Sequence, residues 1–318
     1  MVLVLRALGL GDLLAGLPAL RAVRRALPGH RFVLATPASL SDLVTLTGAV
    51  DAVHPTQAPD LSSWAGPPPD VAVNLHGKGP QSHRALAATG PRRLVAFDCP
   101  EVGHKGPVWD ADEHERSRWC RLVGEVLDVT TDPGDLLLDR PAREPFRRGA
   151  VVVHPGAAYR ARRWPPERFA EVARWAHRRG HPVVVTGGPS ESGLAHEVAR
   201  LAGLEATAVL ADGSGLADLA ALVDAARLVV CGDTGVAHVA SAFGTPSVVL
   251  FGPTPPGRWG PPSEGPHEVV WHGTGVGDPW ADHIDPSLLT VSVDEVVSRA
   301  QRLLTRVAAR AGTTPASG

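Results

Sequence analysis

The chain has 318 residues, of which 44% are hydrophobic, enough for two domains of about 150 residues that each bury a core. Its 31 basic and 33 acidic residues give a formal net charge of −2, which argues against nucleic acid as the main partner. Three cysteines without metal-ligand spacing argue against a disulfide framework. We find no signal-peptide pattern and no apolar run of about 20 residues, so we expect a cytoplasmic protein without a transmembrane segment.

In the first half, short apolar runs alternate with stretches of helical periodicity, the pattern of parallel sheets covered by helices. The expected strands are residues 2–5, 31–35, 50–54, 70–75 and 93–97. One helix is expected from Leu13 to Leu27, ended by Pro28-Gly29, and another over residues 113–127. Residues 128–149 are rich in Pro, Gly and charge, so we place the domain linker there.

A second series of strands and helices follows. The expected strands are residues 150–154, 182–187, 206–210, 228–232 and 247–252, with helices over 165–179, 191–201, 216–226 and 234–243. We predict the α/β class, with two doubly wound Rossmann-like domains, 1–140 and 141–292, that face an interdomain cleft. A helix from residue 293 to about 310 is expected to pack at the domain junction, and the tail TTPASG, residues 313–318, to be disordered. In such folds ligands sit beyond the carboxyl ends of strands, so functional residues should lie in strand-to-helix turns.

The most informative turn lies in CGDTGVAHVASAFGTPSVVLFGP, residues 231–253. A strand delivers Asp233, Thr234 and Gly235 to a helix N-terminus, where free backbone N–H groups and the helix dipole favour a phosphate. Thr234 can donate its hydroxyl to the same anion, Asp233 suits sugar hydroxyls, and His238 follows one turn later on a similar face. The structural alternative is that Asp233 is an N-cap and His238 a packed polar residue.

A basic turn occupies HPGAAYRARRWPPERF, residues 154–169. Arg160, Arg162 and Arg163 follow a strand and a small-residue turn that contains Gly156. Guanidinium groups in this position can bind a diphosphate in bidentate fashion. The alternative is a solvated basic loop.

The segment TGGPSESGLAHE, residues 186–197, predicts a further tight strand-to-helix turn. Gly187 and Gly188 permit the turn, and Glu191 at the helix start can accept a hydrogen bond from a ribose hydroxyl. Glu191 is also explained by simple compensation of the helix dipole.

In the first half, RALGLGDLLAGLPAL, residues 6–20, resembles a dinucleotide fingerprint because Gly9 and Gly11 follow a strand. Leu14 occupies the third glycine position, so the fingerprint fails and a Rossmann dehydrogenase is disfavoured. What remains is a turn that presents one carboxylate, Asp12, at a helix N-terminus. A carboxylate opposite a phosphate-binding domain suits a general base for an attacking hydroxyl, and a helix cap is the alternative.

The turn NLHGKGPQSH, residues 74–83, follows another strand of the first domain. We expect acceptor contacts there from Asn74, His76, Lys78 and Gln81. No metal site is expected, because His177 and His181, although four apart, are separated by the helix-ending Gly180.

Taken together, these turns resemble glycosyltransferase family 9, the ADP-heptose:lipopolysaccharide heptosyltransferases and their relatives, which have the GT-B fold. The carrying segments are GLGDLLAGLPAL, HPGA followed by RRWP, GGPSE, and GDTGVAHVASAFGTPSVVLFGPTPP. They occur in the family's order over most of the chain, and residues 55–150 are covered least. The resemblance implies an acceptor-binding first domain and a nucleotide-sugar-binding second domain.

The resemblance also implies roles for single residues. Asp12 matches the family's proposed general base, and Arg162 matches a basic residue, usually Lys, near the donor phosphates. Glu191 matches the acidic residue that holds the ribose. The loop that binds the donor sugar and diphosphate is matched by Asp233, Thr234, Gly235 and His238. We count Gly156 and Gly188 with the donor-binding turns, and Gly11 with the acceptor side.

The implied function is inverting, metal-independent transfer of a heptose or related sugar from an ADP-sugar to an acceptor hydroxyl. No cofactor is expected beside the nucleotide sugar, most simply ADP-heptose, and we expect a monomer; a peripheral association with a membrane stays open. Two alternatives also stay open, a GT-B-type nucleotide-sugar epimerase and a non-catalytic nucleotide-sugar-binding protein. An aspartic protease is disfavoured because a helix follows the single Asp-Thr-Gly.

The acceptor is not identified by the sequence. The family's best-known acceptor is a lipopolysaccharide core. Only Lys78 and Lys105 accompany 29 arginines, a usage typical of a high-GC genome. A different surface glycan or an aminoglycoside-type natural product is therefore an alternative acceptor.

Overall fold

The computed structural model describes residues 1–312, and the side chains of residues 1–306. The predicted disordered tail, residues 313–318, lies outside the described residues. The chain divides into two compact units, Met1–Asp139 and Arg140–Gly318, and each is described by itself.

The first unit contains a five-stranded sheet in the order β3-β2-β1-β4-β5 with parallel pairing throughout. Its strands are β1 (Val2–Leu5), β2 (Phe32–Thr36), β3 (Ala52–Pro55), β4 (Val71–Asn74) and β5 (Arg93–Val95). The central strands β1, β2 and β4 are buried along their whole length, because helices cover both faces of the sheet. Leu5 pairs with Asn74, so β1 and β4 end side by side.

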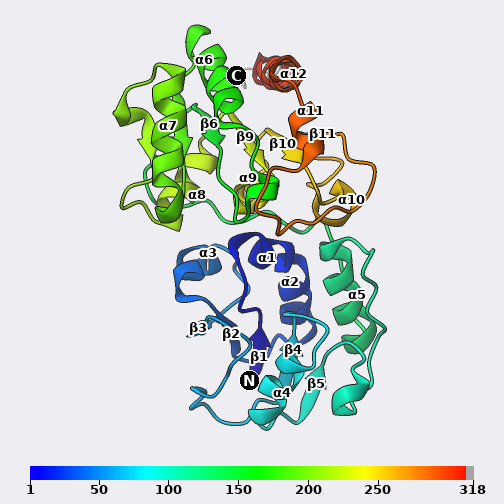
Figure 1. Cartoon of the computed structure of the whole chain (residues 1–318). Coiled ribbons are helices and arrows are strands. Elements are labelled where there is room, and N and C mark those ends of the chain that lie inside the picture. Colours follow the sequence, from blue (N-terminus) through cyan, green and yellow to red (C-terminus); the bar gives the residue numbers. More distant parts are fainter. Residues whose placement is uncertain (313–318) are drawn as a thin grey trace. The chain divides into compact units, whose positions relative to one another are not determined.

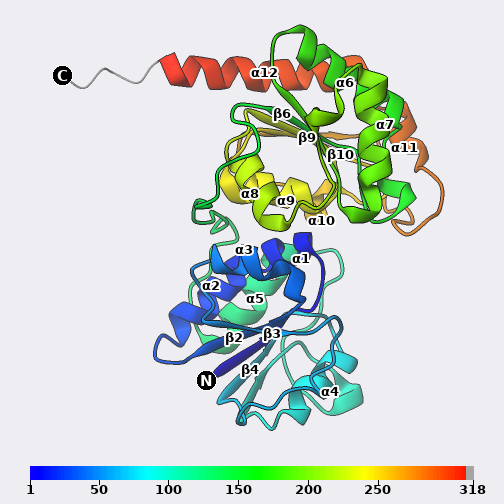
Figure 2. The same cartoon turned by 90° about the vertical axis from the view of Figure 1, so that its left-hand side faces the viewer.

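Helices lie on both faces of this sheet (Figure 1). They are α1 (Leu10–Ala15), α2 (Leu17–Ala26), α3 (Ser41–Thr45), α4 (Gln81–Ala88) and α5 (Glu115–Leu127), with short 3₁₀ turns η1 (Ala38–Leu40) and η2 (Pro100–Val102). Figure 2 shows α2 and α5 on one side of the sheet and α4 on the other, as right-handed crossovers from a central β1 require.

The prediction of a single helix from Leu13 to Leu27 is wrong. The structure divides this segment at Gly16 into the two helices α1 and α2. Pro18, the second residue of α2, has no N–H for a continuous helix, and this favours a new helix start. Gly16 also makes room for the side chain of Arg6, the residue after β1, since a Cβ on Gly16 would lie 2.7 Å from Nε of Arg6. The break therefore brings the first turn of α1 close to Arg6.

The second unit contains a six-stranded parallel sheet in the order β11-β10-β9-β6-β7-β8. Its strands are β6 (Val151–His154), β7 (Val183–Thr186), β8 (Val209–Leu210), β9 (Leu228–Gly232), β10 (Ser247–Phe251) and β11 (His267–Trp271). The core is built from strand valines together with the buried Trp164 and Phe169, whose rings meet edge to face.

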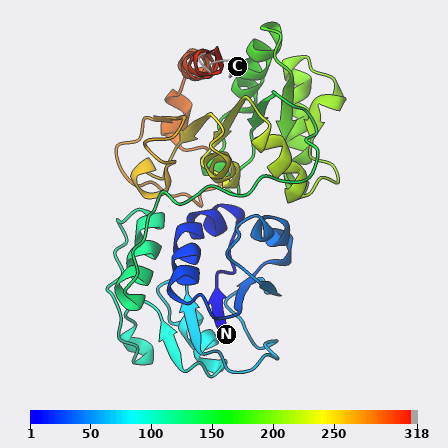
Figure 3. The same cartoon turned by 180° about the vertical axis from the view of Figure 1, so that it is seen from behind.

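The helices of the second unit also cover both faces of its sheet. They are α6 (Pro166–Arg178), α7 (Ser192–Ala202), α8 (Leu216–Asp224), α9 (Gly235–Phe243), α10 (Pro256–Trp259), α11 (Pro286–Thr290) and α12 (Val293–Gly312), with 3₁₀ turns η3 (Arg160–Arg162), η4 (Pro189–Glu191) and η5 (Ala206–Ala208). Figure 2 shows α6, α7 and α12 on one side of this sheet and α8 and α9 on the other. The last helix, α12, drawn in red, lies beside α6 (Figure 3) and also contacts β9, β10 and β11.

The predicted α/β class with two doubly wound domains is confirmed, and two strands differ from expectation. The strand predicted over 206–210 is reduced to Val209–Leu210, because residues 206–208 form a 3₁₀ turn at the sheet edge. The edge strand β11 was not predicted, since HEVVW is a short apolar run whose periodicity is ambiguous. Along the described residues, we find no helix with the length and apolar character needed to cross a bilayer.

Candidate functional site

The turns of the second unit meet because their strands are neighbours. His154 at the end of β6 pairs with Cys231 near the end of β9, and β7 lies on the other side of β6. All three strands run parallel, so the turns that follow them emerge at one edge of the sheet. This edge, which we call the donor edge, carries residues 155–162, 187–191 and 233–235.

At the donor edge, Arg162 and Asp233 form a loose ion pair. Nη1 of Arg162 lies 3.9 Å from Oδ2 of Asp233, and the guanidinium lies over the Tyr159 ring at 5.6 Å. Nε of Arg162 is buried without a hydrogen-bond partner among the described residues. Burial raises the pKa of Asp233 to about 6, although Arg162 and a hydrogen bond with Thr254 oppose this shift. The ion pair with Asp233 therefore leaves N–H groups of the Arg162 guanidinium available to bind an anion.

The N-terminus of α9 starts beside this pair. Its N-cap is Thr234, not Asp233, and the Thr234 side chain makes no hydrogen bond that caps the helix. The first N–H groups of a nine-residue helix are therefore left without a side-chain cap, as a phosphate site requires. His238 is half-buried on the first turn of α9, and its ring meets Trp259 of α10 edge to face at 5.9 Å.

Glu191 is held tightly at the end of η4, the turn that follows β7. Its Oε2 accepts a hydrogen bond from the Gly188 N–H at 2.9 Å and lies 3.7 Å from Nε2 of His154. Burial lowers the pKa of His154, whose Nδ1 lies 2.9 Å from the Thr186 hydroxyl. A Cβ on Gly156 would come within 2.3 Å of the Glu191 carboxylate. The glycine in HPGA is therefore needed so that this carboxylate can lie against the β6 turn.

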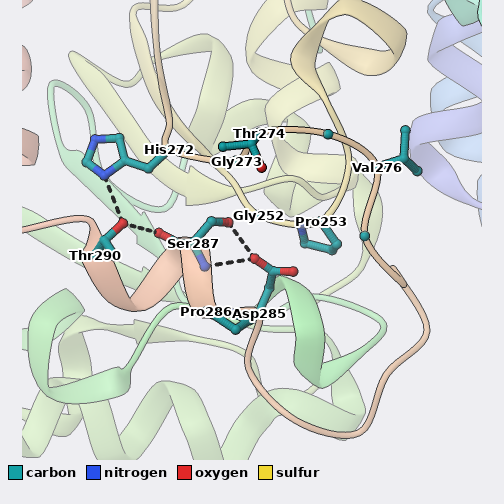
Figure 4. Close-up of a pocket in the computed structure, with 12 residues that line it drawn as sticks. Gly252, Pro253, His272, Gly273, Thr274, Val276, Asp285, Pro286, Ser287 and Thr290 are labelled. Carbon is teal, nitrogen blue, oxygen red and sulfur yellow. Dashed lines mark hydrogen bonds between the residues drawn. The ribbon is translucent and has the colours of Figure 1, made fainter.

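A cavity of about 410 Å³ opens beyond β10 and β11, beside the donor edge (Figure 4). The loop on its rim is tied to the arginine turn, since Ala161 N–H donates to Ala281 and Ala161 C=O accepts from Asp285. The ionisable side chains that line the cavity, His272 and Asp285, already interact with other residues of the protein. His272 lies 3.0 Å from Glu295 Oε2, and Asp285 accepts the Ser287 N–H at 2.9 Å.

In the first unit, Asp12 both caps a helix and keeps an accessible carboxylate. Its Oδ2 accepts the Gly9 N–H at 3.2 Å, and its side chain is 30% exposed. Oδ1 lies 3.9 Å from Nη2 of Arg6. Burial raises the pKa of Asp12, Arg6 opposes this shift, and Glu115 adds to it. A carboxylate with a raised pKa is a better proton acceptor near neutral pH.

Arg6 is the charged residue beneath Asp12, and its side chain is fully buried. Its guanidinium donates to the backbone carbonyls of Asp12 and Leu75, and Nη2 lies 3.4 Å from Glu115 Oε1. The same guanidinium lies 5.0 Å over the Trp119 ring.

The predicted acceptor residues differ in exposure. Asn74 is fully buried, and its amide nitrogen lies within 3.1 Å of Gly77 O, Ser82 Oγ and His83 Nδ1. It therefore shapes its own turn, while Lys78 and Gln81 are exposed. His76 is half-buried, its Nδ1 accepts the Ala7 N–H at 3.2 Å, and burial lowers its pKa to about 4. Gly11, also half-buried, precedes Asp12 in α1.

Within the described part of the chain, no group of three or more His, Cys, Asp or Glu side chains is arranged to hold a metal ion. The three cysteines are free and buried.

The structure thus brings together Arg162, Asp233, Thr234 and Glu191 with their glycines at the donor edge. In the first unit, Asp12 and His76 each interact with Arg6. Sequence reasoning missed Arg6, His154 and Thr254. His154 carried a usable signal, since it ends a strand and is the first residue of HPGA. Arg6 carried none, because a lone arginine after an apolar strand is usually a surface residue.

Comparison with known proteins finds one family whose model matches the chain. Residues 107–274, more than half of the chain, match the model of glycosyltransferase family 9 (heptosyltransferase). Lipopolysaccharide heptosyltransferase 1 of Pseudomonas aeruginosa is 30% identical over 81% of this chain and 80% of its own length. Lipopolysaccharide heptosyltransferase 3 of Escherichia coli is 32% identical, but the match spans only 48% of this chain and 46% of that protein.

A solved structure, the E. coli ADP-heptose lipopolysaccharide heptosyltransferase II, resembles the fold with a TM-score of 0.76 at 20% identity. The similarity covers 96% of this chain and 98% of that one. It confirms the predicted GT-B fold.

Proposed function

Because the chain belongs to glycosyltransferase family 9, we propose that it transfers a heptose, or a closely related sugar, from ADP-heptose to an acceptor hydroxyl with inversion at the anomeric carbon. ADP-heptose as the donor is supported by relatives that are named heptosyltransferases, one of them for ADP-heptose. These relatives favour a transferase over an epimerase or a non-catalytic binding protein.

The observation that carries the proposal is the donor edge. Arg162 and the uncapped N-terminus of α9 supply positive charge for a diphosphate. Glu191, held by the Gly188 N–H, suits the hydroxyls of a ribose. Asp233 beside Arg162 suits hydroxyls of the transferred sugar. One sheet edge therefore offers groups for three parts of an ADP-sugar, namely the diphosphate, the ribose and the transferred sugar.

The reaction would use both units. The acceptor hydroxyl forms a bond to the anomeric carbon while its proton passes to the Asp12 carboxylate. The bond from that carbon to the diphosphate oxygen breaks on the opposite face, and ADP leaves with the electron pair. Arg162 and the helix N-terminus stabilise the charge that develops on the diphosphate, at about 3 kcal/mol for each preorganised donor.

The test has two parts. A thermal-shift screen of nucleotide sugars should find the largest stabilisation with ADP-heptose, because a ligand that binds only the native state raises Tm by mass action. The donor found in this screen is then incubated with the protein and a panel of heptose- and aminosugar-bearing acceptors. NMR of the product should show the inverted anomeric configuration. Retention of configuration, or conversion of the donor without an acceptor, would overturn the proposal.

Asp12→Asn separates chemistry from binding. The variant should bind ADP as the unaltered protein does, as measured by calorimetry, and lose transfer by about 100-fold or more. Unchanged turnover would remove Asp12 from the role of base.

A further inference from the structure

Arg6 is a buried cation whose position is fixed on every side. Its guanidinium donates to the carbonyls of Asp12 and Leu75, which belong to two different turns of the first unit. The Trp119 ring lies below it, and the missing side chain of Gly16 leaves it room. A side chain with this many anchors has little freedom, so it can fix the first turn of α1 in one place.

Glu115 is the buried carboxylate that faces this cation. Its side chain is 7% exposed, and its Oε1 lies 3.4 Å from Arg6 and accepts the Trp119 indole N–H at 2.6 Å. Its Oε2 accepts a hydrogen bond from Arg118, which is held in turn by backbone carbonyls, among them Asp110 at 2.9 Å. The four ionised groups Asp12, Arg6, Glu115 and Arg118 alternate in sign and sum to zero charge.

We propose that Arg6 and Glu115 are positioning residues for the transfer reaction: Arg6 holds Asp12 in place through its backbone and carboxylate, and Glu115 offsets the charge of Arg6. The inference rests on the proposed role of Asp12 as the base.

The alternating order matters because a base beside an uncompensated buried cation is a weak base. An opposite charge within about 4–6 Å lowers a carboxyl pKa by one to three units. Arg6 does this to Asp12, while Glu115 and burial act in the other direction, so that the pKa stays above its ordinary value. Among the described residues, His76 also faces Arg6, and it is neutral at pH 7 because burial lowers its pKa to about 4. His76 therefore does not disturb the balance.

The proposal predicts opposite effects of two amide substitutions. Glu115→Gln removes a negative charge and should lower the pKa of Asp12. The acid limb of the profile of kcat against pH should then move to lower pH by about one unit. Arg6→Gln removes the positive charge, so the same limb should move to higher pH, and kcat should fall because Asp12 is no longer held. A purely structural role would lower activity without moving the limb in either direction. Limbs that stay in place, or move in the same direction, overturn the proposal.

The matched control is Glu125→Gln on the same helix, α5. Glu125 is 52% exposed and lies 3.7 Å from Arg121, away from Asp12, so its removal should leave the limb where it is. A limb that moves equally in this variant would overturn the proposal, because the effect would then be one of overall charge.

A second readout covers the case in which Arg6→Gln does not fold. The Gly9 N–H donates to Asp12 Oδ2, so its NMR chemical shift reports ionisation of that carboxyl directly. In Glu115→Gln, an isosteric change, the midpoint of this titration should fall. An unchanged midpoint contradicts the proposal even where activity is lost.

The variant Asp12→Asn distinguishes two outcomes: failure of this inference and failure of the proposed function. If that variant keeps turnover, the assignment of the base is wrong. If it is inactive and yet the limb is unmoved in Glu115→Gln, the function stands and the inference about Arg6 and Glu115 falls.

Discussion

Asp233 is a buried carboxylate whose ionisation costs stability. Burial raises its pKa from 3.8 to about 6. Between these values the folded state binds more protons than the unfolded state, so this group lowers the free energy of unfolding as the pH rises through that window. Above pH 6 the Asp233 carboxyl is ionised and its full cost to stability is present. The proposed hydrogen bond from a sugar hydroxyl requires this ionised form. This is the conflict between stability and activity that is common at functional sites.

We therefore predict that Asp233→Asn stabilises the protein while it reduces transfer. The gain in unfolding free energy relative to the unaltered chain should grow by roughly 1 kcal/mol between pH 5 and pH 8. Denaturant unfolding at both pH values measures it. Equal differences at the two pH values would show that Asp233 does not titrate in this range.

Asp51→Asn is the matched control in the first unit. Hydrogen bonds from Arg24 and the Phe32 N–H lower the pKa of Asp51, so its contribution is present at neutral pH and is lost as the pH falls. This substitution should therefore become more costly as the pH rises, with the opposite sign to Asp233→Asn.

Single residues also show where sequence reasoning ends. Asp12, Glu191 and Thr234 were singled out because each follows a strand and starts a helix, and such positions can be identified from the sequence. Arg6 and Glu115 could not be identified this way, since their pairing joins positions 109 apart through tertiary packing. The N-cap of α9 is Thr234, one residue after the alternative expected at Asp233, because backbone geometry decides the cap.

Among the elements, the turn after β6 and the turn η4 after β7 depend on each other. We predict that Gly156→Ala weakens ADP binding by about 10-fold or more, because the added Cβ would lie 2.3 Å from the Glu191 carboxylate and displace it. Calorimetry with ADP measures the effect. Gly193→Ala in α7 is the control, since a Cβ there meets nothing within 4 Å. Equal affinities in the two variants would contradict the assigned geometry.

The order of elements was largely predictable, because parallel strands buried on both faces are continuous apolar runs such as VLVL and VVVT. Predictions of elements from the sequence were wrong where local signals compete. The helix predicted over 13–27 contains Gly16 and Pro18, and the packing of Arg6 against Gly16 decides in favour of two helices. The edge strands β8 and β11 pair with one neighbour only and are mostly half-buried, so their apolar pattern is weaker.

For the molecule as a whole, the two units differ in the chemistry that they offer. The described side chains near Asp12 in the first unit balance each other in charge, which suits proton transfer. The donor edge of the second unit has Arg162 and an uncapped helix N-terminus, which suit a diphosphate. The division of roles between the units, with the acceptor on the first and the donor on the second, stays a prediction, as do a monomeric state and a cytoplasmic location.

The last prediction concerns the source of positive charge for the leaving ADP. If Arg162 and the N-terminus of α9 supply it, transfer should be unchanged after treatment with a strong chelator, and added Mg²⁺ should not raise kcat. Arg162→Ala should then lose about 100-fold in kcat/KM, since one preorganised donor is worth about 3 kcal/mol. Arg162→Lys should recover part of this loss, because it keeps the charge without the bidentate fork. Loss of activity on chelation, reversed by a metal ion, would instead show that a cation shares the role of Arg162.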